Sequence, residues 1–421
     1  MEGCSLQDRL YKRFLRYVAI SSQSNAAAGK VPSSEGQRVL AELLKEDLAE
    51  LGVVDLDITA ESVLTGRLPA YLPKLECNNV SAIPKVGFVA HLDTVNVNLS
   101  AEIKPQLFKN YDGNDVILNK EKNIIMKVDE HPELSKYIGQ DILFTDGTSV
   151  LGADNKAAIS VLLVALEEIR NRQLPHGELY FCFVPDEEIG LCGFKALDLA
   201  KFPVDFAYTI DCCEEGEVVY ETFNAGTGKV KIKGISAHPM SAKGVLLNPT
   251  LIAVDMINCF DRKETPENTD GRDGYIWVQA MQSNQSMAEV TLNIRDHSKE
   301  KYEQRKKYIN DVIDFIQKRY PRAEIECRIT DIYGNIKDAI NEENSKCVDL
   351  IYQAMKNLRI QPKTIAMRGG TDGSFLSTKG IPTPNYFTGA HNFHSNFEFL
   401  PMKSFEKSCK LTLEIISLIV Y

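Results

Sequence analysis

Val86-Gly87-Phe88-Val89-Ala90 is a short apolar run that ends at His91-Leu92-Asp93-Thr94. An uninterrupted apolar run of this length is typical of a strand buried on both faces of a sheet. Open α/β sheets build their functional sites beyond the carboxyl ends of such strands. The stretch therefore predicts a central strand that delivers His91 and Asp93 to a site.

Two later segments repeat this arrangement of an apolar strand followed by acidic groups. Residues 178–184 run into Glu187-Glu188, and residues 206–210 end at Asp211. Helical stretches lie between the strands, as is usual when parallel strands are joined by crossovers. The pattern predicts an α/β fold, with a mostly parallel sheet covered by helices on both faces.

Asp154, in Gly152-Ala153-Asp154-Asn155-Lys156, stands where a turn-rich segment meets an amphipathic helix. An Asp before such a helix commonly caps its N-terminus, which is the ordinary interpretation of an isolated aspartate. Four other segments, however, also bring His, Asp or Glu to the ends of apolar strands. Asp154 is therefore predicted to bridge two metal ions.

Five side chains of these segments form a ligand set for two divalent cations. Zinc binds imidazole nitrogen and carboxylate oxygen, and a catalytic zinc keeps one position open for water. His91 and Asp211 would hold one ion. Glu188 and His394 would hold the other, and Asp154 has two oxygens with which to bridge them. Hard ligands without cysteine suit two Zn²⁺ per chain, with Mn²⁺ or Co²⁺ as alternatives.

Asp93 and Glu187 are predicted to act beside these ligands. In an extended segment Asp93 points to the same face as His91, where its carboxylate could accept the other imidazole N–H and fix the tautomer. Glu187 would take a proton from the metal-bridging water as it attacks a carbonyl, and then pass that proton to the leaving amine. Taken singly, His91 is more typical of a core histidine and Glu187-Glu188 of a solvated loop, but their joint placement favours a site.

From about Gly226 the pattern of apolar and polar residues changes. Strand, helix, strand, strand, helix and strand are predicted at residues 229–235, 248–260, 275–280, 287–294, 301–318 and 323–329. This order is that of a ferredoxin-like unit. We therefore predict a discontinuous di-metal catalytic domain, residues 1–226 and 332–421, interrupted by an inserted lid or dimerisation-type domain at residues 227–331.

The remaining segments are less regular. Helical spacing predicts helices at residues 6–18, 39–51 and 347–358 and at the C-terminus, and one more strand lies near residues 384–387. Residues 98–147 are polar and predict a surface excursion with a hairpin. Residues 53–82 have mixed patterning, so no element is predicted there.

The overall composition limits the class of partner. The chain has 421 residues, 44% hydrophobic and 25% charged, as expected for a globular protein of two domains. A net charge of -10 without a Lys/Arg block argues against nucleic-acid binding. No apolar stretch approaches the ~20 residues of a membrane span, and residues 1–5 lack a secretory signal. The ten cysteines are scattered, which predicts reduced thiols in a cytoplasmic protein.

Six motifs together resemble the peptidase T family of tripeptide aminopeptidases, which are co-catalytic di-zinc metallopeptidases. They lie at residues 90–95 (AHLDTV), 146–154 (DGT and LGAD), 185–190 (PDEEIG), 236–239 (SAHP), 368–373 (RGGTDG) and 392–394 (NFH). The resemblance implies a zinc-dependent aminopeptidase that releases the N-terminal residue of tripeptides. It implies the ligand and catalytic roles assigned above, and a short peptide as the partner.

The resemblance also implies substrate contacts outside the ligand set. His238 would contact the bound peptide or its developing oxyanion, and Arg368 would hold the peptide's C-terminal carboxylate. A guanidinium meets a carboxylate with two parallel hydrogen bonds, so a fixed Arg368 would select peptide length. Without its glycine-rich loop Arg368 would equally suit a surface salt bridge. Arg295 is a weaker candidate for substrate contact.

Several positions depart from the family pattern. Cysteines replace the usual glycines at Cys212-Cys213, and the other departures are Asn155 for Asp, Leu191 for a basic residue, and Met240 and Ala390 for glycines. The proposed ligands and Glu187 are all present, so the chemistry is expected to be retained. Met240 and Leu191 leave the strictness for tripeptides open. His391, three residues before His394, is the rival ligand or a neighbour of the site.

Two alternatives therefore stand beside the tripeptide aminopeptidase. One is a related metal-dependent dipeptidase or deacylase of small N-acyl amino acids. The other is a catalytically decayed peptide-binding protein, suggested by Cys212-Cys213 and Met240. The sequence leaves open whether the chain is a monomer or a homodimer, and whether His238 acts on its own site or on a neighbour's.

Overall fold

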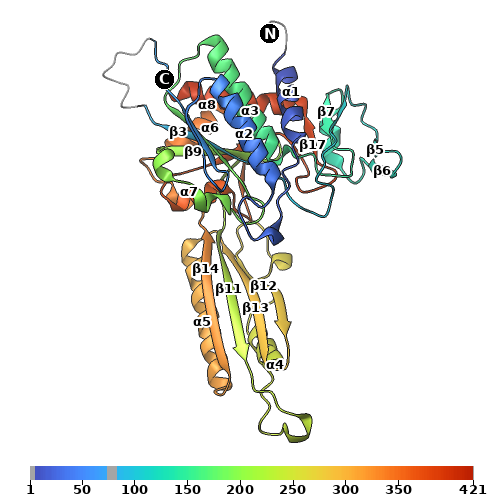
Figure 1. Cartoon of the computed structure of the whole chain (residues 1–421), viewed down its shortest axis with the longest axis vertical. Helices are drawn as coiled ribbons and strands as arrows, with labels where there is room; N and C mark the ends of the chain where they lie inside the picture. The colour runs from blue at the N-terminus through green and yellow to red at the C-terminus, as the bar shows by residue number, and fades with distance from the viewer. Residues whose placement is uncertain (1–4, 74–82, 421) are drawn as a thin grey trace. The chain divides into compact units, whose positions relative to one another are not determined.

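The structure is a computed structural model that describes residues 5–73 and 83–420. Residues 1–4, where no secretory signal was expected, and the unassigned residues 74–82 lie outside the described residues. The chain divides into two compact units (Figure 1). Unit 1 comprises Met1–Tyr220, Ile340–Ile365 and Thr371–Tyr421, and unit 2 comprises Glu221–Ala339 and Ala366–Gly370.

Unit 1 is built on an eight-stranded sheet with a parallel centre. Its strands are β1 (Val54–Ile58), β2 (Leu64–Leu68), β3 (Val86–His91), β8 (Leu179–Val184), β9 (Phe206–Cys212), β10 (Glu217–Glu221), β15 (Lys363–Ala366) and β16 (Asn385–Phe387). They lie in the order β1-β2-β8-β3-β9-β16-β10-β15. β3 pairs in parallel with β8 and β9, and β16 pairs in parallel with β9, whereas β2 and β10 join antiparallel. The predicted α/β fold with a mostly parallel sheet is confirmed.

Helices pack on this sheet. They are α1 (Leu6–Val18), α2 (Glu35–Glu50), α3 (Ala153–Arg172), α6 (Lys346–Asn357), α7 (Asp372–Thr378) and α8 (Met402–Leu418). α3 contacts β3 and β9 as well as α1 and α8, which is why it is apolar around most of its circumference. α7 also contacts β3 and β9, where Leu376 packs in a buried cluster with Val89 and Ala207.

Two small sheets lie beside the large one. β4 (Gln106–Phe108), β7 (Ile142–Phe144) and β17 (Phe399–Pro401) form a three-stranded antiparallel sheet, and β5 (Val116–Asn119) pairs with β6 (Ile124–Met126). Residues 98–147 therefore contain the predicted hairpin. They also contribute β4 and β7 to a sheet with β17, which the sequence did not predict because three-residue strands show no periodicity.

Unit 2 has the predicted βαββαβ order. Its elements are β11 (Asn224–Lys233), α4 (Pro249–Ile257), β12 (Tyr275–Ser283), β13 (Met287–Asp296), α5 (Lys299–Arg319) and β14 (Glu324–Tyr333). The strands form an antiparallel sheet in the order β12-β13-β11-β14, and both helices contribute to its buried core. β11 begins at Asn224, before the start predicted at residue 229. The sequence did not reveal this first part because Gly226 and Gly228 interrupt the alternation of apolar and polar residues.

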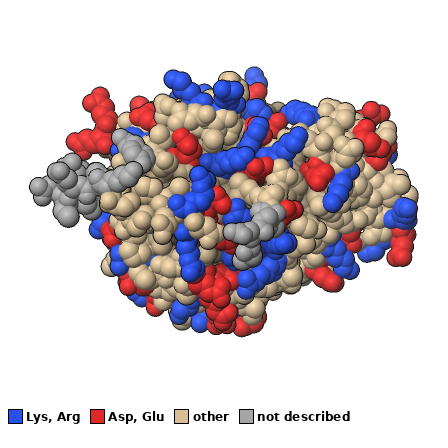
Figure 2. Space-filling view, turned by 90° about the horizontal axis from the view of Figure 1, so that it is seen from above, with Lys and Arg blue, Asp and Glu red and all other residues tan. Residues whose placement is uncertain are grey.

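The surface carries both signs of charge. On the face drawn in Figure 2, basic and acidic side chains are interspersed over the exposed elements. Among residues 5–73 and 83–420, no helix has the length and apolar character needed to cross a lipid bilayer. The eight cysteines in this part of the chain are free thiols.

Candidate metal centre

The parallel strands of unit 1 bring the predicted ligands to one edge of the sheet. His91 ends β3, and Asp211 is the penultimate residue of β9. Glu188 follows β8, whose last residue, Val184, is in register with His91. Asp154 opens α3, and His394 lies in the loop between β16 and β17. The shared direction of β3, β8 and β9 makes this convergence possible.

The five residues form two groups that share Asp154. One group is His91, Asp154 and Asp211, and the other is Asp154, Glu188 and His394. Within each group one ligand atom per residue lies within 4.8 Å of the others. His91 and Asp154 are buried, whereas the side chain of His394 is 47% exposed. The centre is therefore accessible to water and substrate on the side of His394.

Each imidazole faces two carboxylate oxygens at once. Nε2 of His91 lies 2.8 Å from Oδ1 of Asp154 and 3.9 Å from Oδ1 of Asp211. Nε2 of His394 lies 3.1 Å from Oδ2 of Asp154 and 3.0 Å from Oε1 of Glu188. One N–H cannot satisfy two acceptors, and Oε1 of Glu188 is buried without an aligned hydrogen bond despite the short distance. A cation within each group would bind all of these atoms, so the residues fit a pair of metal ions.

Burial and charge together explain how the cluster ionises. Burial, with the carboxylate of Asp154 nearby, raises the pKa of Glu188 to about 7. The same two causes raise the pKa of Asp211 above its ordinary value. In Asp154 burial is outweighed by hydrogen bonds from His394 and His91, which lower its pKa. A hydrogen bond to Asp154 and the adjacent carboxylate of Glu188 raise the pKa of His394 to about 10. The three carboxylates of the two groups outnumber the two imidazoles, and divalent cations would neutralise the remaining negative charge.

Asp154 does not cap α3. Its backbone angles, φ -83° and ψ 102°, are extended and not helical, and no side chain caps this end of the helix. Its two oxygens instead face His91 and His394. The next residue, Asn155, donates from Nδ2 to Oδ1 of Asp211 at 3.0 Å. An aspartate at position 155 would place a second carboxylate against Asp211, so the asparagine suits this geometry.

Asp93 holds the segment that carries both glutamates. Its carboxylate accepts the backbone N–H of Glu187 at 3.0 Å and that of Glu188 at 3.1 Å. Nδ1 of His91 lies 3.0 Å from the carbonyl oxygen of Asp93 and 3.4 Å from its carboxylate. The imidazole partner is therefore chiefly the Asp93 carbonyl, whereas the sequence suggested the carboxylate. Either oxygen can accept a hydrogen bond from Nδ1–H, and that tautomer leaves Nε2 unprotonated and able to bind a metal.

Glu187 and Asp372 complete the acidic cluster. Burial and the carboxylate of Asp372 raise the pKa of Glu187 above its ordinary value. Asp372 is itself buried, and its Oδ1 has no hydrogen-bond partner within residues 5–73 and 83–420. Asp372 is not among the site residues predicted from the sequence, although it lies within the RGGTDG motif. Asp372 lies in the first turn of α7, directly after the capping residue Thr371, and this position could have indicated it as a site residue.

His391, the rival ligand, lies outside both groups. Its Nε2 is hydrogen-bonded to the hydroxyl of Tyr137 at 2.6 Å, and its ring stacks on Phe399 with the centroids 4.7 Å apart. Burial lowers the pKa of His391 to about 4. The imidazole of His391 is therefore neutral, and its contacts with Tyr137 and Phe399 support the loop that carries His394.

The three predicted substrate contacts belong to unit 2. Nδ1 of His238 accepts the backbone N–H of Met240 at 3.2 Å. Arg295 donates to the carbonyl oxygens of Gly226 and Ile294. Arg368 donates to Thr269 and to the carbonyls of Gly271 and Asp273, and its guanidinium lies over the rings of Phe223 and Tyr275 at 5.2 and 5.6 Å. None of the three belongs to the ligand groups of unit 1.

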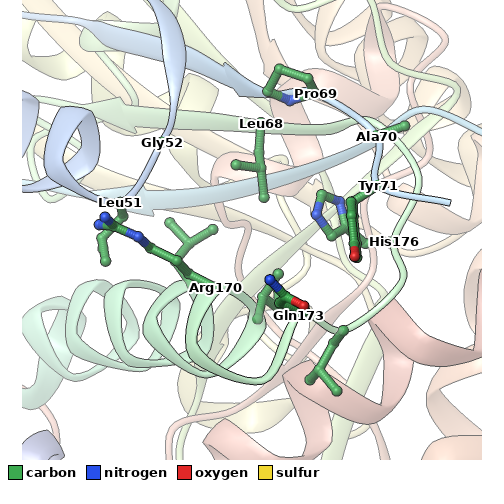
Figure 3. A pocket seen from close by; sticks show the side chains of 12 residues that line it. Leu51, Gly52, Leu68, Pro69, Ala70, Tyr71, Arg170, Gln173 and His176 are labelled. Atoms are coloured by element: carbon green, nitrogen blue, oxygen red, sulfur yellow. The ribbon is translucent and has the colours of Figure 1, made fainter. Parts of the chain in front are cut away.

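A separate hollow of about 320 Å³ lies elsewhere in unit 1 (Figure 3). It is lined mainly by apolar residues of the α2 end, the β2 end and the last turns of α3, with Tyr71, Arg170, Gln173 and His176 among the polar ones. Among the residues that the structure describes, no carboxylate lines it, and Nδ1 of His176 lies 2.8 Å from the carbonyl of Gly177. This hollow lacks the groups that a hydrolytic site requires.

The fold and the paired ligand groups define a peptidase of a known family. Residues 152–418 match peptidase family M20/M25/M40, and the chain belongs to that family. It is 50% identical to a peptidase T-like protein of Yersinia pestis and 40% identical to peptidase T of Fusobacterium nucleatum, over 98% and 97% of both chains respectively. Among solved structures, aminopeptidase PepT of Bacillus cereus shares the fold, with a TM-score of 0.75, 20% identity and 99% of each chain covered.

Proposed function

We propose that this chain is a metal-dependent aminopeptidase that releases the N-terminal residue of tripeptides, with two zinc ions per chain. The observation that carries the proposal is the pair of ligand groups sharing Asp154. Peptidase T relatives matched over nearly the whole chain support the reaction. Tripeptides are the proposed substrate because RGGTDG, the loop of Arg368, is among the motifs that resemble that family.

The residues of the proposed centre have two roles, metal binding and proton transfer. His91 and Asp211 would hold one ion and Glu188 and His394 the other, with Asp154 between them. When bound, two such ions lower the pKa of a water molecule and polarise the scissile carbonyl. Glu187 accepts the proton of the attacking water and later donates it to the leaving amine. A carboxyl whose pKa is raised above its ordinary value is suited to moving a proton in both directions.

Asp93 is proposed to act indirectly on this reaction. Its carboxylate accepts hydrogen bonds from the backbone N–H groups of Glu187 and Glu188. These bonds fix the positions of the proposed base, Glu187, and the proposed ligand, Glu188. Its carbonyl also faces Nδ1 of His91, which favours the tautomer with Nε2 free for metal. Asp93 therefore positions groups that react and does not need to touch the peptide.

Arg368 is proposed to select peptide substrates by their length. Its aromatic neighbours Phe223 and Tyr275 and its hydrogen bonds to the 269–273 loop restrict the guanidinium to one orientation. A restricted guanidinium binds a carboxylate with little further loss of entropy. Binding the C-terminal carboxylate there would favour one peptide length. His238 and Arg295 are proposed as further contacts to the peptide.

The decisive experiment incubates zinc-loaded protein with di-, tri- and tetrapeptides of one composition and identifies the released products. Release of the N-terminal residue, fastest from tripeptides and abolished by a chelator, is expected. Failure to cleave any tripeptide would refute the proposal. Faster cleavage of N-acyl amino acids would assign a deacylase instead. Metal analysis separates an enzyme, with about two ions per chain, from a decayed peptide-binding protein.

A further inference from the structure

Glu398 is a buried carboxylate that contacts the backbone beside Asp154. It is 1% exposed. Its Oε2 accepts the N–H of Leu151 at 2.6 Å and that of Gly152 at 2.9 Å, and its Oε1 accepts the N–H of Asp154 at 3.2 Å. Both oxygens are thus engaged by three donors from one short segment. Glu398 has no place in either ligand group.

The local backbone is shaped for this contact. Gly152 has a φ of 73°, a left-handed conformation that favours glycine. A Cβ at position 152 would also approach Cδ1 of Ile103 to 2.8 Å. The turn at Gly152 leaves the N–H groups on both sides of it directed at one carboxylate. Three N–H groups converging on an anion form the kind of concavity that proteins use to bind anions, here with the anion supplied by the chain itself.

Glu398 also belongs to the loop that carries His394. Its backbone N–H donates to the carbonyl of Ser395 at 3.2 Å. The next residue, Phe399, exchanges two backbone hydrogen bonds with His391 and pairs with Phe144 of β7. β7 in turn leads into the segment of Asp154. The side chain of Glu398 therefore connects two loops that each supply a ligand to the same group.

We propose that Glu398 is a positioning residue that fixes Asp154 between the two metal ions. By holding the backbone of residues 151–154, it keeps the two oxygens of Asp154 directed at His91 and His394 before any ion binds. Because it stands on the loop of His394, it also sets the spacing between Asp154 and that ligand. This inference rests on the proposed metal centre.

The test compares Glu398→Gln with a matched control, Asp205→Asn. Glutamine has the shape of glutamate, but its amide N–H₂ group would face a backbone N–H that needs an acceptor. Asp205 likewise accepts a backbone N–H, that of Lys85, but it lies at the opposite ends of β3 and β9. Two readouts are measured for both variants: zinc affinity by chelator competition, and amide hydrogen exchange of residues 151–154 in metal-free protein.

We expect Glu398→Gln to remain folded by circular dichroism and to bind zinc about 10- to 100-fold more weakly, the usual cost of losing a residue that orients a ligand. Exchange at residues 151–154 should rise on the order of tenfold in the metal-free variant, because charge-assisted hydrogen bonds are lost. Asp205→Asn should change neither quantity. Wild-type zinc affinity and unaltered exchange in Glu398→Gln would overturn the proposal.

The two readouts separate this inference from the proposed function. If wild-type protein bound no zinc, the metal centre would be refuted. Faster exchange at residues 151–154 in Glu398→Gln would then still establish that Glu398 holds this segment, and unchanged exchange would refute that as well. If Glu398→Gln fails to fold, Glu398→Asp replaces it: a shorter carboxylate retains the charge and is expected to restore part of the zinc affinity lost in an alanine variant.

Discussion

Asp93 accepts hydrogen bonds from two successive backbone N–H groups and presents its own carbonyl to His91. In Asp93→Asn, one acceptor oxygen is replaced by a donor that faces an N–H group. We expect zinc affinity to fall about 10- to 100-fold, because His91 and the segment of Glu188 lose their support. Chelator competition measures this, with the exposed Asp112→Asn as control. Equal affinities in the two variants would show that Asp93 does not position the ligands.

The role of Glu187 in catalysis should be distinguishable from metal binding. Glu187→Ala removes the proposed proton carrier but none of the ligand atoms in the two groups. Turnover of a tripeptide should therefore fall at least ~100-fold, the usual scale for a general base, while two zinc ions are retained. Steady-state kinetics and metal analysis on the same preparation measure both. Near-full turnover in this variant would exclude Glu187 as the base.

At the scale of residues, the sequence could predict which side chains the structure brings together, but not the groups that hold them in place. His91, Asp93 and Asp211 were identifiable because each follows an apolar strand, where α/β folds place functional groups. Glu398 acts on backbone N–H groups far away in sequence, and no residue pattern marks such partners. The main acceptor for His91 is also a backbone carbonyl, which sequence cannot distinguish from the carboxylate of the same residue.

At the scale of elements, Arg13 joins three helices of unit 1. From α1 it donates to Asp47 of α2 at 2.9 Å and to Glu167 of α3 at 2.8 Å. Asp47 is almost fully buried, and the hydroxyl of Tyr17 also donates to it. The interaction keeps α1 and α2 against α3, the helix that begins at the metal centre.

Removing Arg13 should therefore destabilise unit 1. We expect Arg13→Ala to lower the free energy of unfolding by about 2 kcal/mol, the scale of hydrogen bonds to a charged group. The control is Arg16→Ala, which removes another contact to Asp47 from a side chain that is 47% exposed, so a smaller loss is expected. Urea denaturation monitored by circular dichroism compares them. An equal or larger loss in Arg16→Ala would contradict this assignment.

The elements that sequence analysis found are those with enough residues to show a period. β3, β8 and β9 have six or seven residues each, and α3 and α5 span several turns. β4, β7 and β17 have three residues each, so their pairing could not be foreseen. In unit 2 the order of elements was predicted, because its long strands alternate visibly. The first residues of β11 were missed where glycines interrupt that alternation.

At the scale of the whole molecule, the two units have separate cores. Leu292 is fully buried in the core of unit 2, among residues of β11, β13, α4 and α5. Leu292→Ala should destabilise unit 2 by about 2–5 kcal/mol, the usual cost of a large cavity. Zinc affinity should be unchanged, because all five proposed ligands belong to unit 1.

Two measurements check this prediction on one protein. Hydrogen exchange should show faster opening of β13 and α5 in Leu292→Ala, while protection of β3 and α3 is retained. Chelator competition should give the wild-type zinc affinity. Leu163→Ala, in the buried face of α3, is the matched control that should lower protection in unit 1 instead. A parallel loss of zinc affinity in Leu292→Ala would show that the two units fold as one.

The order of the ligands along the chain affects the timing of biosynthesis. His91, Asp154 and Asp211 are all translated before unit 2 begins, whereas His394 emerges only after all of it. A ribosome-bound chain therefore contains every residue of the first group before unit 2 is made, but it lacks His394 of the second. If the proposed centre is correct, a polypeptide interrupted before residue 394 lacks one proposed ligand and is expected to be inactive.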